Sequence, residues 1–205
     1  LKVVIENFPE GKIEWLPALN NPNSDKQEQR EIPFSREIWI EEDDFMEEPS
    51  KKFFRLAPGK EVRLRYAFFV TCNAVIKDED GEIVELRCSY DPETRGGNAP
   101  DGRKVKGTIH WVSAEHAKDA EVRVYNSFYN TPTPGRDRDF IEDINPNSLE
   151  VLENCKIEPD LITLDDNVPI QFERLGYFYK DPDTTPEKHI YNRTISLRDT
   201  WNKKP

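Results

Sequence analysis

Cysteine, histidine and methionine are scarce in this sequence of 205 residues, which has three cysteines, three histidines and one methionine. Cys72, Cys88 and Cys155 form no C-x-x-C pair, and no histidine stands near them at the spacing of a zinc ligand. An odd number of cysteines also argues against a complete disulfide framework. We therefore expect reduced thiols, no metal site and a cytoplasmic protein.

Long apolar runs and catalytic motifs are also missing. No stretch approaches the roughly 20 apolar residues that cross a membrane, so we expect no membrane partner. The sequence has no phosphate-binding glycine loop, and Gly96-Gly97 stands alone as a turn. It also lacks G-x-S-x-G, H-E-x-x-H and a nucleophilic cysteine in a histidine context. These absences predict a binding module that by itself is not catalytic and holds no cofactor.

Basic residues are fewer than acidic ones. The chain has 29 lysines and arginines against 40 aspartates and glutamates, which gives a net charge of −11 and a pI near 4.9. This balance argues against a nucleic-acid-binding surface over the whole molecule, but it leaves room for a local basic patch. Acidic residues crowd into positions 41–48, where they either repel RNA from the neighbouring surface or simply keep the protein soluble.

The clearest basic patch overlaps an alternating run. Every second residue from 62 to 70 is apolar or aromatic, which predicts one strand over Lys60–Val70. Arg63 and Arg65 should then point together to the other face, about 6–7 Å apart, close to the phosphate spacing of a nucleic-acid strand; a solvated strand face is the alternative. Upstream, Lys51–Arg55 adds three cations and two phenylalanines, one of which should be exposed, either to stack on a base or to cover a barrel end.

Strand signals dominate the rest of the chain, because 16 prolines and nine glycines separate short apolar or alternating runs. The expected strands are Lys2–Glu6, Glu37–Ile40, Lys60–Val70, Ala74–Lys77, Ile83–Tyr90, Val105–Val112, Ala120–Tyr125, Leu149–Glu153, Gln171–Tyr179 and Lys188–Ser196. Asp78–Gly81 is an expected hairpin turn, Ser113–Ala117 and Asp139–Ile144 are expected short helices, and the four tryptophans are expected in the core. So many strands predict an all-β fold with two packed barrels.

Three motifs resemble one known family. They are Gly102–Ser113 (GRKVKGTIHWVS), Gln171–Phe178 (QFERLGYF) and Tyr191–Trp201 (YNRTISLRDTW). Together with Val62–Arg65, they closely resemble the C-terminal anticodon-binding region of bacterial-type glutaminyl-tRNA synthetases, over essentially the whole chain. Members of that family attach glutamine to its tRNA with ATP and Mg²⁺, through a catalytic domain that lies upstream. The resemblance implies a non-catalytic piece of a longer, monomeric protein, with a glutamine-accepting tRNA as its partner and no DNA partner.

The resemblance also implies a fold and a domain division. The family's region has two β-barrels of the ribosomal-protein L25-like type, with short helices. Residues 1–42 and 118–205 should form a discontinuous proximal barrel beside the rest of the synthetase, and residues 43–117 a distal barrel further along the tRNA. The chain would then pass from the proximal to the distal barrel and back.

Site residues follow from the same resemblance, because the family splays out the three anticodon bases so that side chains can read their edges. The implied contacts are Arg63 and Arg65 for the first base, Gln171 and Arg174 for the central uridine, and Lys52 and Arg55 for the third base, a guanosine. Phe54 stands where some members have a lysine, which removes part of the polar contact expected at the third base.

Three other classes stay open. A glutamyl-tRNA synthetase of the non-discriminating or the archaeal and eukaryotic kind has related barrels, although the run Gln171–Arg174 favours the glutamine enzyme. A ribosomal-RNA-binding protein of the L25-like fold is disfavoured by the chain length and by the motifs Gln171–Phe178 and Asn192–Trp201. A β-module that binds protein or carbohydrate would suit the acidic pI and the many aromatic residues.

Overall fold

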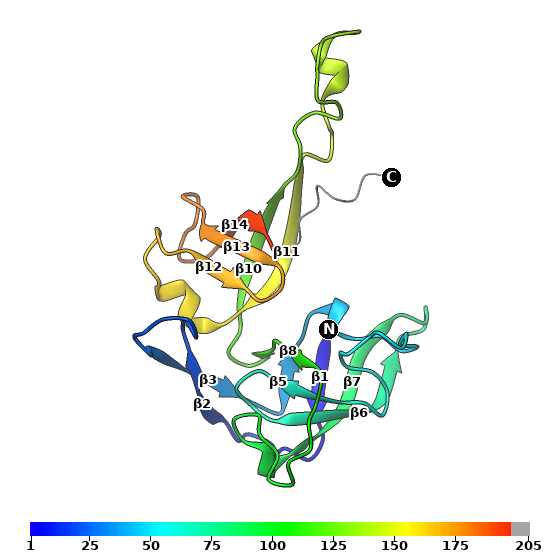
Figure 1. Cartoon of the computed structure of the whole chain (residues 1–205), viewed down its shortest axis with the longest axis vertical. Coiled ribbons are helices and arrows are strands. Elements are labelled where there is room, and N and C mark those ends of the chain that lie inside the picture. The colour runs from blue at the N-terminus through cyan, green and yellow to red at the C-terminus, as the bar shows by residue number, and fades with distance from the viewer. Residues whose placement is uncertain (198–205) are drawn as a thin grey trace. The chain divides into compact units, whose positions relative to one another are not determined.

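The structure, a computed structural model, describes residues 1–197. Strands dominate these residues, and every helix among them is a short 3-10 helix. The chain folds into two compact units, residues 1–117 (unit 1) and residues 118–205 (unit 2). Curled sheets form a partial barrel in each unit (Figure 1), so the expected all-β, barrel-like fold is confirmed.

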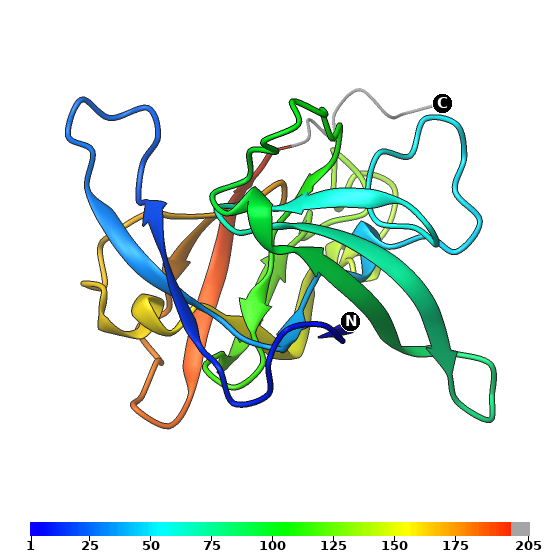
Figure 2. The same cartoon turned by 90° about the horizontal axis from the view of Figure 1, so that it is seen from below.

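Unit 1 contains a seven-stranded sheet in the order β8-β5-β6-β7-β1-β4-β9 and a separate hairpin of β2 and β3. Its elements are β1 (Lys2–Ile5), β2 (Glu14–Leu19), β3 (Gln29–Phe34), β4 (Glu37–Trp39), η1 (Glu42–Asp44), β5 (Glu61–Leu64), β6 (Phe69–Lys77), β7 (Ile83–Asp91), η2 (Pro92–Thr94), β8 (Thr108–Ile109) and β9 (Val112–Ser113). β6 and β7 are long and curve together (Figure 2). Gly81 adopts a φ of 87° in the turn between them, as a tight hairpin requires.

The division of the chain differs from the expected discontinuous barrel. β1 pairs with β4 on one side and with β7 on the other, so that Val3 lies opposite both Ile38 and Leu86. Strands from residues 1–42 and from residues 43–117 therefore share one sheet. Residues 1–42 belong to unit 1, and no unit boundary falls near residue 42.

Aromatic rings fill the core of unit 1. Phe34 is fully buried, and its ring centroid lies 5.0 Å from that of Phe8 and 5.1 Å from those of Phe68 and Trp111. Trp111 is buried, as expected, whereas Trp39 is half-buried and Trp201 lies outside the described residues. The core placement of Trp15 is wrong. This residue is 48% exposed, because it lies on the outward face of β2, between the inward-facing positions of that strand.

We expect Phe34→Ala to lower the free energy of unfolding of unit 1 by about 3–5 kcal/mol, since it removes a fully buried ring and leaves a cavity. Urea denaturation followed by NMR signals of unit 1 measures the loss. The matched control is Trp15→Ala, which removes an exposed ring and should cost less than about 1 kcal/mol. Equal losses for the two variants would contradict this description of the core.

Several expected elements have other forms in the structure. The run Val105–Val112 holds two short strands, β8 and β9, instead of one. The expected helix Ser113–Ala117 is wrong: Ser113 ends β9, and a turn follows in which His116 N–H and Ala117 N–H donate to Ser113 O at 3.3 Å and 2.8 Å. The Ser113 hydroxyl bonds to the hydroxyl of Ser35 at 2.7 Å and to the ring of His116 at 2.9 Å, and these contacts tie the residue to its neighbours in the fold.

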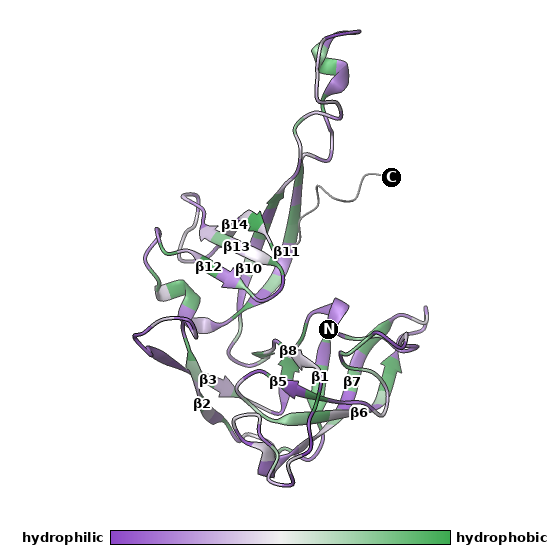
Figure 3. Cartoon of the chain, in the orientation of Figure 1, coloured by the Kyte–Doolittle hydropathy of each residue, from purple (hydrophilic) through white to green (hydrophobic). Residues whose placement is uncertain are grey.

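Unit 2 contains a five-stranded sheet in the order β11-β10-β14-β13-β12. Its elements are β10 (Lys118–Tyr125), η3 (Phe140–Asp143), β11 (Leu149–Ile157), η4 (Pro159–Thr163), β12 (Ile170–Phe172), β13 (Gly176–Lys180) and β14 (His189–Ser196). The ribbon that β10 and β11 begin continues away from the sheet and carries η3 near its end (Figure 1). Hydrophobic and hydrophilic residues intermingle along this ribbon (Figure 3), whereas Phe178 and Tyr191 pack in the core of the unit.

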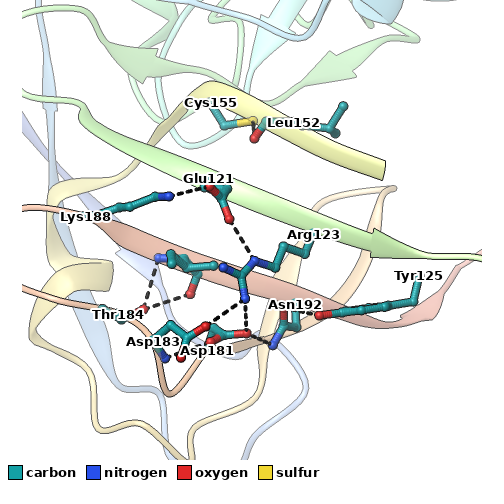
Figure 4. Close-up of polar contacts among 11 residues, drawn as sticks. Glu121, Arg123, Tyr125, Leu152, Cys155, Asp181, Asp183, Thr184, Lys188 and Asn192 are labelled. Carbon is teal, nitrogen blue, oxygen red and sulfur yellow. Dashed lines mark hydrogen bonds and ion pairs between the residues drawn. The ribbon is translucent and has the colours of Figure 1, made fainter. Parts of the chain in front are cut away.

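A network of charges joins β10 to the chain between β13 and β14 (Figure 4). Arg123 donates hydrogen bonds to Glu121 at 2.7 Å and to Asp181 at 3.1 Å, and Asn192 donates to the same Asp181 oxygen at 2.5 Å. Burial works to raise the pKa of Asp181, but a backbone N–H, Asn192 and Arg123 together hold it below its usual range. Each cation of this network is paired with carboxylates of the same unit, so Arg123 stabilises unit 2 and offers little positive charge to a ligand.

Candidate nucleic-acid interface

Arg63 and Arg65 lie on a hairpin and do not share one strand. β5 ends at Leu64, and a hydrogen bond of 2.8 Å from Leu64 N–H to Phe68 O closes the turn into β6. Within that turn Tyr66 adopts a φ of 63°, a left-handed conformation that is rare for a bulky residue. The single strand expected over this run is therefore wrong, and so is the common strand face expected for the two arginines.

The side chain of Arg63 is fixed along its length. Its guanidinium carbon lies 5.4 Å from the ring centroid of Phe69, which is the range of a cation–π contact. Gly97 covers the aliphatic part so closely that a Cβ there would lie 2.8 Å from Arg63 Cδ. Arg63 Nε is buried and has no hydrogen-bond partner among residues 1–197. The fold thus holds this arginine without satisfying all of its donors.

Arg65 is held through its backbone. Its N–H donates to Ile109 O at 3.0 Å, and its carbonyl accepts a hydrogen bond from Trp111 Nε1 at 3.0 Å. The guanidinium carbon lies 5.7 Å from the ring centroid of Tyr66. The turn therefore carries a second arginine two residues after Arg63, with its backbone anchored on the chain near residues 109–111.

Lys52 and Arg55 differ in how freely they can meet a ligand. Lys52 is exposed and makes no hydrogen bond or ion pair with the described part of the chain. Arg55 instead donates to Asp43 O at 2.7 Å and lies 3.4 Å from Asp44 Oδ1. The Asp44 side chain is 1% exposed, so Arg55 serves to neutralise a buried carboxylate. Part of the acidic run 41–48 is therefore structural, and Lys52 is the more available cation.

Phe54 joins this loop to the rest of unit 1. It is 51% exposed, and Lys106 Nζ lies 5.1 Å from its ring centroid. Gly107 packs so tightly against the loop that a Cβ there would lie 2.0 Å from Phe54 O. The N–H of Arg63 donates to the carbonyl of the same Gly107 at 2.9 Å. The structure thus brings the Lys52–Arg55 loop and the Arg63 hairpin together at residues 106–107.

Lys106 is a residue of this surface that the sequence analysis missed. The basic stretch GRKVKG was noted there as part of a family motif and of an expected strand, but no contact with a ligand was assigned to it. The contact with Phe54 joins residues 52 positions apart in the chain. The alternation of apolar residues that predicts a strand gives no information about a contact at this separation.

Unit 2 carries the other two expected residues on one hairpin. Gln171 is an exposed residue of β12 opposite Tyr177 of β13. Arg174 lies in the connecting turn with a φ of 64°, and it is half-buried. A non-glycine residue in the left-handed region costs free energy, and such residues cluster at functional sites. Gln171 and Arg174 therefore lie on the same hairpin, near the N-terminal end of β13, whereas Asp181 follows the C-terminal end of that strand.

The described residues offer neither a metal site nor a membrane-spanning helix. Among the described residues, no group of three or more histidine, cysteine, aspartate or glutamate side chains is arranged to hold a metal ion. Within residues 1–197, no helix has the length and apolar character needed to span a membrane. The cations, amide and exposed aromatic of the two hairpins and the loop are the groups that single-stranded RNA recognition uses.

Two family models match the chain, and both are described as the anticodon-binding domain of class I tRNA synthetases (E and Q). One matches residues 1–91 and the other residues 108–181. The chain belongs to this family. The expected resemblance is therefore confirmed for both halves of the chain, and the matched ranges include all six expected site residues of this anticodon-binding region.

Similar curated proteins carry the name glutamine–tRNA ligase. The protein of Bradyrhizobium diazoefficiens is 58% identical over 203 residues, which is 99% of this chain and 36% of that protein. That of Aliivibrio salmonicida is 52% identical over 202 residues, 98% of this chain and 36% of the relative. That of Rhodopirellula baltica is 48% identical over 206 residues, which is 99% of this chain and 34% of the relative. This anticodon-binding chain thus spans about a third of the length of the relatives it matches.

Proposed function

We propose that this chain binds the anticodon loop of a glutamine-accepting tRNA, as the C-terminal part of a glutamine–tRNA ligase. The observation that carries the proposal is the 58% identity to a glutamine–tRNA ligase over 99% of the chain. In the proposed enzyme an upstream catalytic domain attaches glutamine with ATP and Mg²⁺. The enzyme works as a monomer in the cytoplasm.

Each candidate residue has a role in this proposal. Arg63 and Arg65 read the first anticodon base from the β5–β6 turn. Lys52 contacts the third base or its phosphate, while Arg55 orders the loop through Asp44 and adds charge beside it. A charged residue close to RNA phosphates raises affinity by releasing counterions, so the loop contributes mainly to affinity.

Gln171 and Arg174 read the central uridine. A uridine edge presents two carbonyl acceptors around one N–H donor. Arg174 offers only donors, whereas the Gln171 amide both donates and accepts. Together the two side chains can pair with all three groups of the uridine edge, which is the reason to assign base identity to this hairpin.

We expect the purified chain to bind glutamine tRNA without activating glutamine or charging the tRNA, because it carries no nucleotide-binding or catalytic motif. Fluorescence titration measures the binding, and glutamine-dependent pyrophosphate exchange measures activation. Exchange by the purified chain would contradict the proposal. The matched family covers both the glutamate and the glutamine enzymes, so glutamate tRNA is the control RNA. Tighter binding of glutamate tRNA would assign the chain to a glutamate enzyme.

A further inference from the structure

The Gly102–Trp111 segment carries a motif to which the proposed function gives no role. Its backbone runs beside β5 and the turn that follows. Gly107 O accepts a hydrogen bond from Arg63 N–H at 2.9 Å, and Ile109 O accepts one from Arg65 N–H at 3.0 Å. β8 pairs in parallel with β5 at the same place. The segment therefore fixes the backbone of both arginines that are proposed to read the first base.

Arg103 ties the start of this segment to β5. Its Nε and Nη2 donate to the two carboxylate oxygens of Glu61, each at 3.0 Å, and its Nη1 donates to Asp101 at 2.8 Å. Nη2 also contacts Asp91, and the hydrogen bond from Arg103 is the main cause that holds the pKa of Asp91 below its usual range. Three carboxylates surround one guanidinium, so Arg103 offers no free positive charge to a phosphate.

Arg103 and Arg63 contact the same aromatic ring. Their guanidinium carbons lie 5.3 Å and 5.4 Å from the ring centroid of Phe69. Phe69 is also the residue paired with Arg63 across β5 and β6. Since Arg63 Nε is buried without a partner among the described residues, the fold keeps this side chain in place against a desolvation cost. A donor kept at such a cost calls for an explanation.

We propose that Arg103 is a positioning residue for anticodon reading, which holds Arg63 in its reading orientation through Glu61 and Phe69 and does not touch the RNA. The proposal rests on the proposed function of Arg63. Glu61 lies two residues before Arg63 on the same strand, and Phe69 lies beside it on the next strand. One guanidinium thus fixes two neighbours of Arg63. The effect of Arg103 must therefore pass through Arg63, and it depends on geometry rather than on charge.

Glu61→Gln, in the full-length protein that contains this chain, separates geometry from charge. If net charge alone matters, removing an acid near bound RNA strengthens binding. If Glu61 holds Arg103, the same change weakens binding of tRNA with the native anticodon, on the order of threefold to tenfold. The matched control is Glu79→Gln, because Glu79 is exposed in the β6–β7 turn and loses the same charge. The control should leave affinity unchanged or slightly raised.

A double-mutant cycle of Arg103→Lys with Arg63→Ala measures whether the effect passes through Arg63. Lysine keeps the charge but cannot reproduce the two-pronged contact with the Glu61 carboxylate. We expect Arg103→Lys to lower affinity several-fold when Arg63 is present and to have little effect in the Arg63→Ala background. Arg103→Lys should also reduce discrimination at the first anticodon base, and it should leave discrimination at the central base unchanged.

The possible failures are distinguishable. Unchanged affinity in Arg63→Ala alone would show that the assignment of Arg63 in the proposed function is wrong, and the positioning role would fall with it. If Arg63→Ala weakens binding but Glu61→Gln tightens it as Glu79→Gln does, only the positioning role is overturned. Equal effects of Arg103→Lys with and without Arg63 overturn it too. A lower melting temperature with equal losses for every anticodon would instead assign Arg103 a purely structural role.

Discussion

Arg63→Ala should weaken binding of glutamine tRNA by about 1–3 kcal/mol, because it removes a charge-assisted contact to RNA. This corresponds to a loss of affinity on the order of tenfold to a hundredfold. The fold should survive, since the substitution removes a buried Nε that has no hydrogen-bond partner among the described residues. A fluorescence titration at fixed salt concentration measures the affinity, and a melting curve of the same sample checks the fold.

The matched control for this prediction is Arg87→Ala. Arg87 is a half-buried arginine of β7 whose guanidinium pairs with Glu85 at 2.6 Å. Its removal changes the net charge by the same amount and should alter tRNA affinity by less than about 0.5 kcal/mol. Equal affinities of the Arg63 and Arg87 variants would remove Arg63 from the interface, and a large drop in melting temperature for Arg63→Ala would assign it to the fold.

Gln171→Ala should narrow the preference for uridine over cytidine at the central anticodon position. Cytidine replaces one carbonyl acceptor of uridine with an amino donor, which would face the protons of Arg174 or of the Gln171 amide. Such unpaired polar groups cost about 1–3 kcal/mol. When the Gln171 amide is removed, part of this discrimination is lost. The ratio of kcat/KM for the uridine tRNA to kcat/KM for the cytidine tRNA, measured in the full-length enzyme, should therefore fall about tenfold or more.

Gln27→Ala provides the control for this measurement. Gln27 is an exposed glutamine in unit 1, outside every candidate contact, and its replacement should leave the ratio unchanged. If kcat/KM for the uridine and cytidine tRNAs fell in parallel in Gln171→Ala, with the ratio preserved, Gln171 would support the hairpin without reading the base.

The sequence predicted most strands of the sheets and the turn at Gly81, but it did not predict the turn after Leu64. Every second residue from 62 to 70 is apolar or aromatic, yet the chain reverses after Leu64. The turn contains no glycine, proline or asparagine, and Tyr66 supplies the positive φ that such residues usually provide. Tertiary contacts override local pattern here, because Trp111 and Ile109 hold the backbone of the turn from a distant segment.

The β2–β3 hairpin went unpredicted for a different reason. Each strand contains a proline, Pro17 in β2 and Pro33 in β3. A proline argues against a central strand, but it is tolerated where the backbone N–H needs no ladder partner. These two strands form a separate two-stranded sheet, so each has a free edge on which a proline removes no hydrogen bond.

The candidate site could be predicted only as separate residues. Resemblance implied that Arg63 and Arg65 contact RNA, but it gave no sign that Arg103 binds Glu61 or that Lys106 lies over the ring of Phe54. These contacts join residues about 40 to 50 positions apart, and a local pattern cannot predict a contact at that range. The sequence also could not predict that Arg55 turns toward Asp44, because this contact depends on the burial of the Asp44 side chain.

Binding of short RNA hairpins tests most directly whether this chain reads an anticodon. The purified chain would be titrated with a stem-loop bearing the glutamine anticodon and with three variants, each changed at one anticodon base. Base-specific pockets predict an affinity loss of about tenfold for a change at each position, since each leaves polar groups unpaired. Equal affinity for all four hairpins would contradict the account, because it would mean that the chain binds RNA by charge alone.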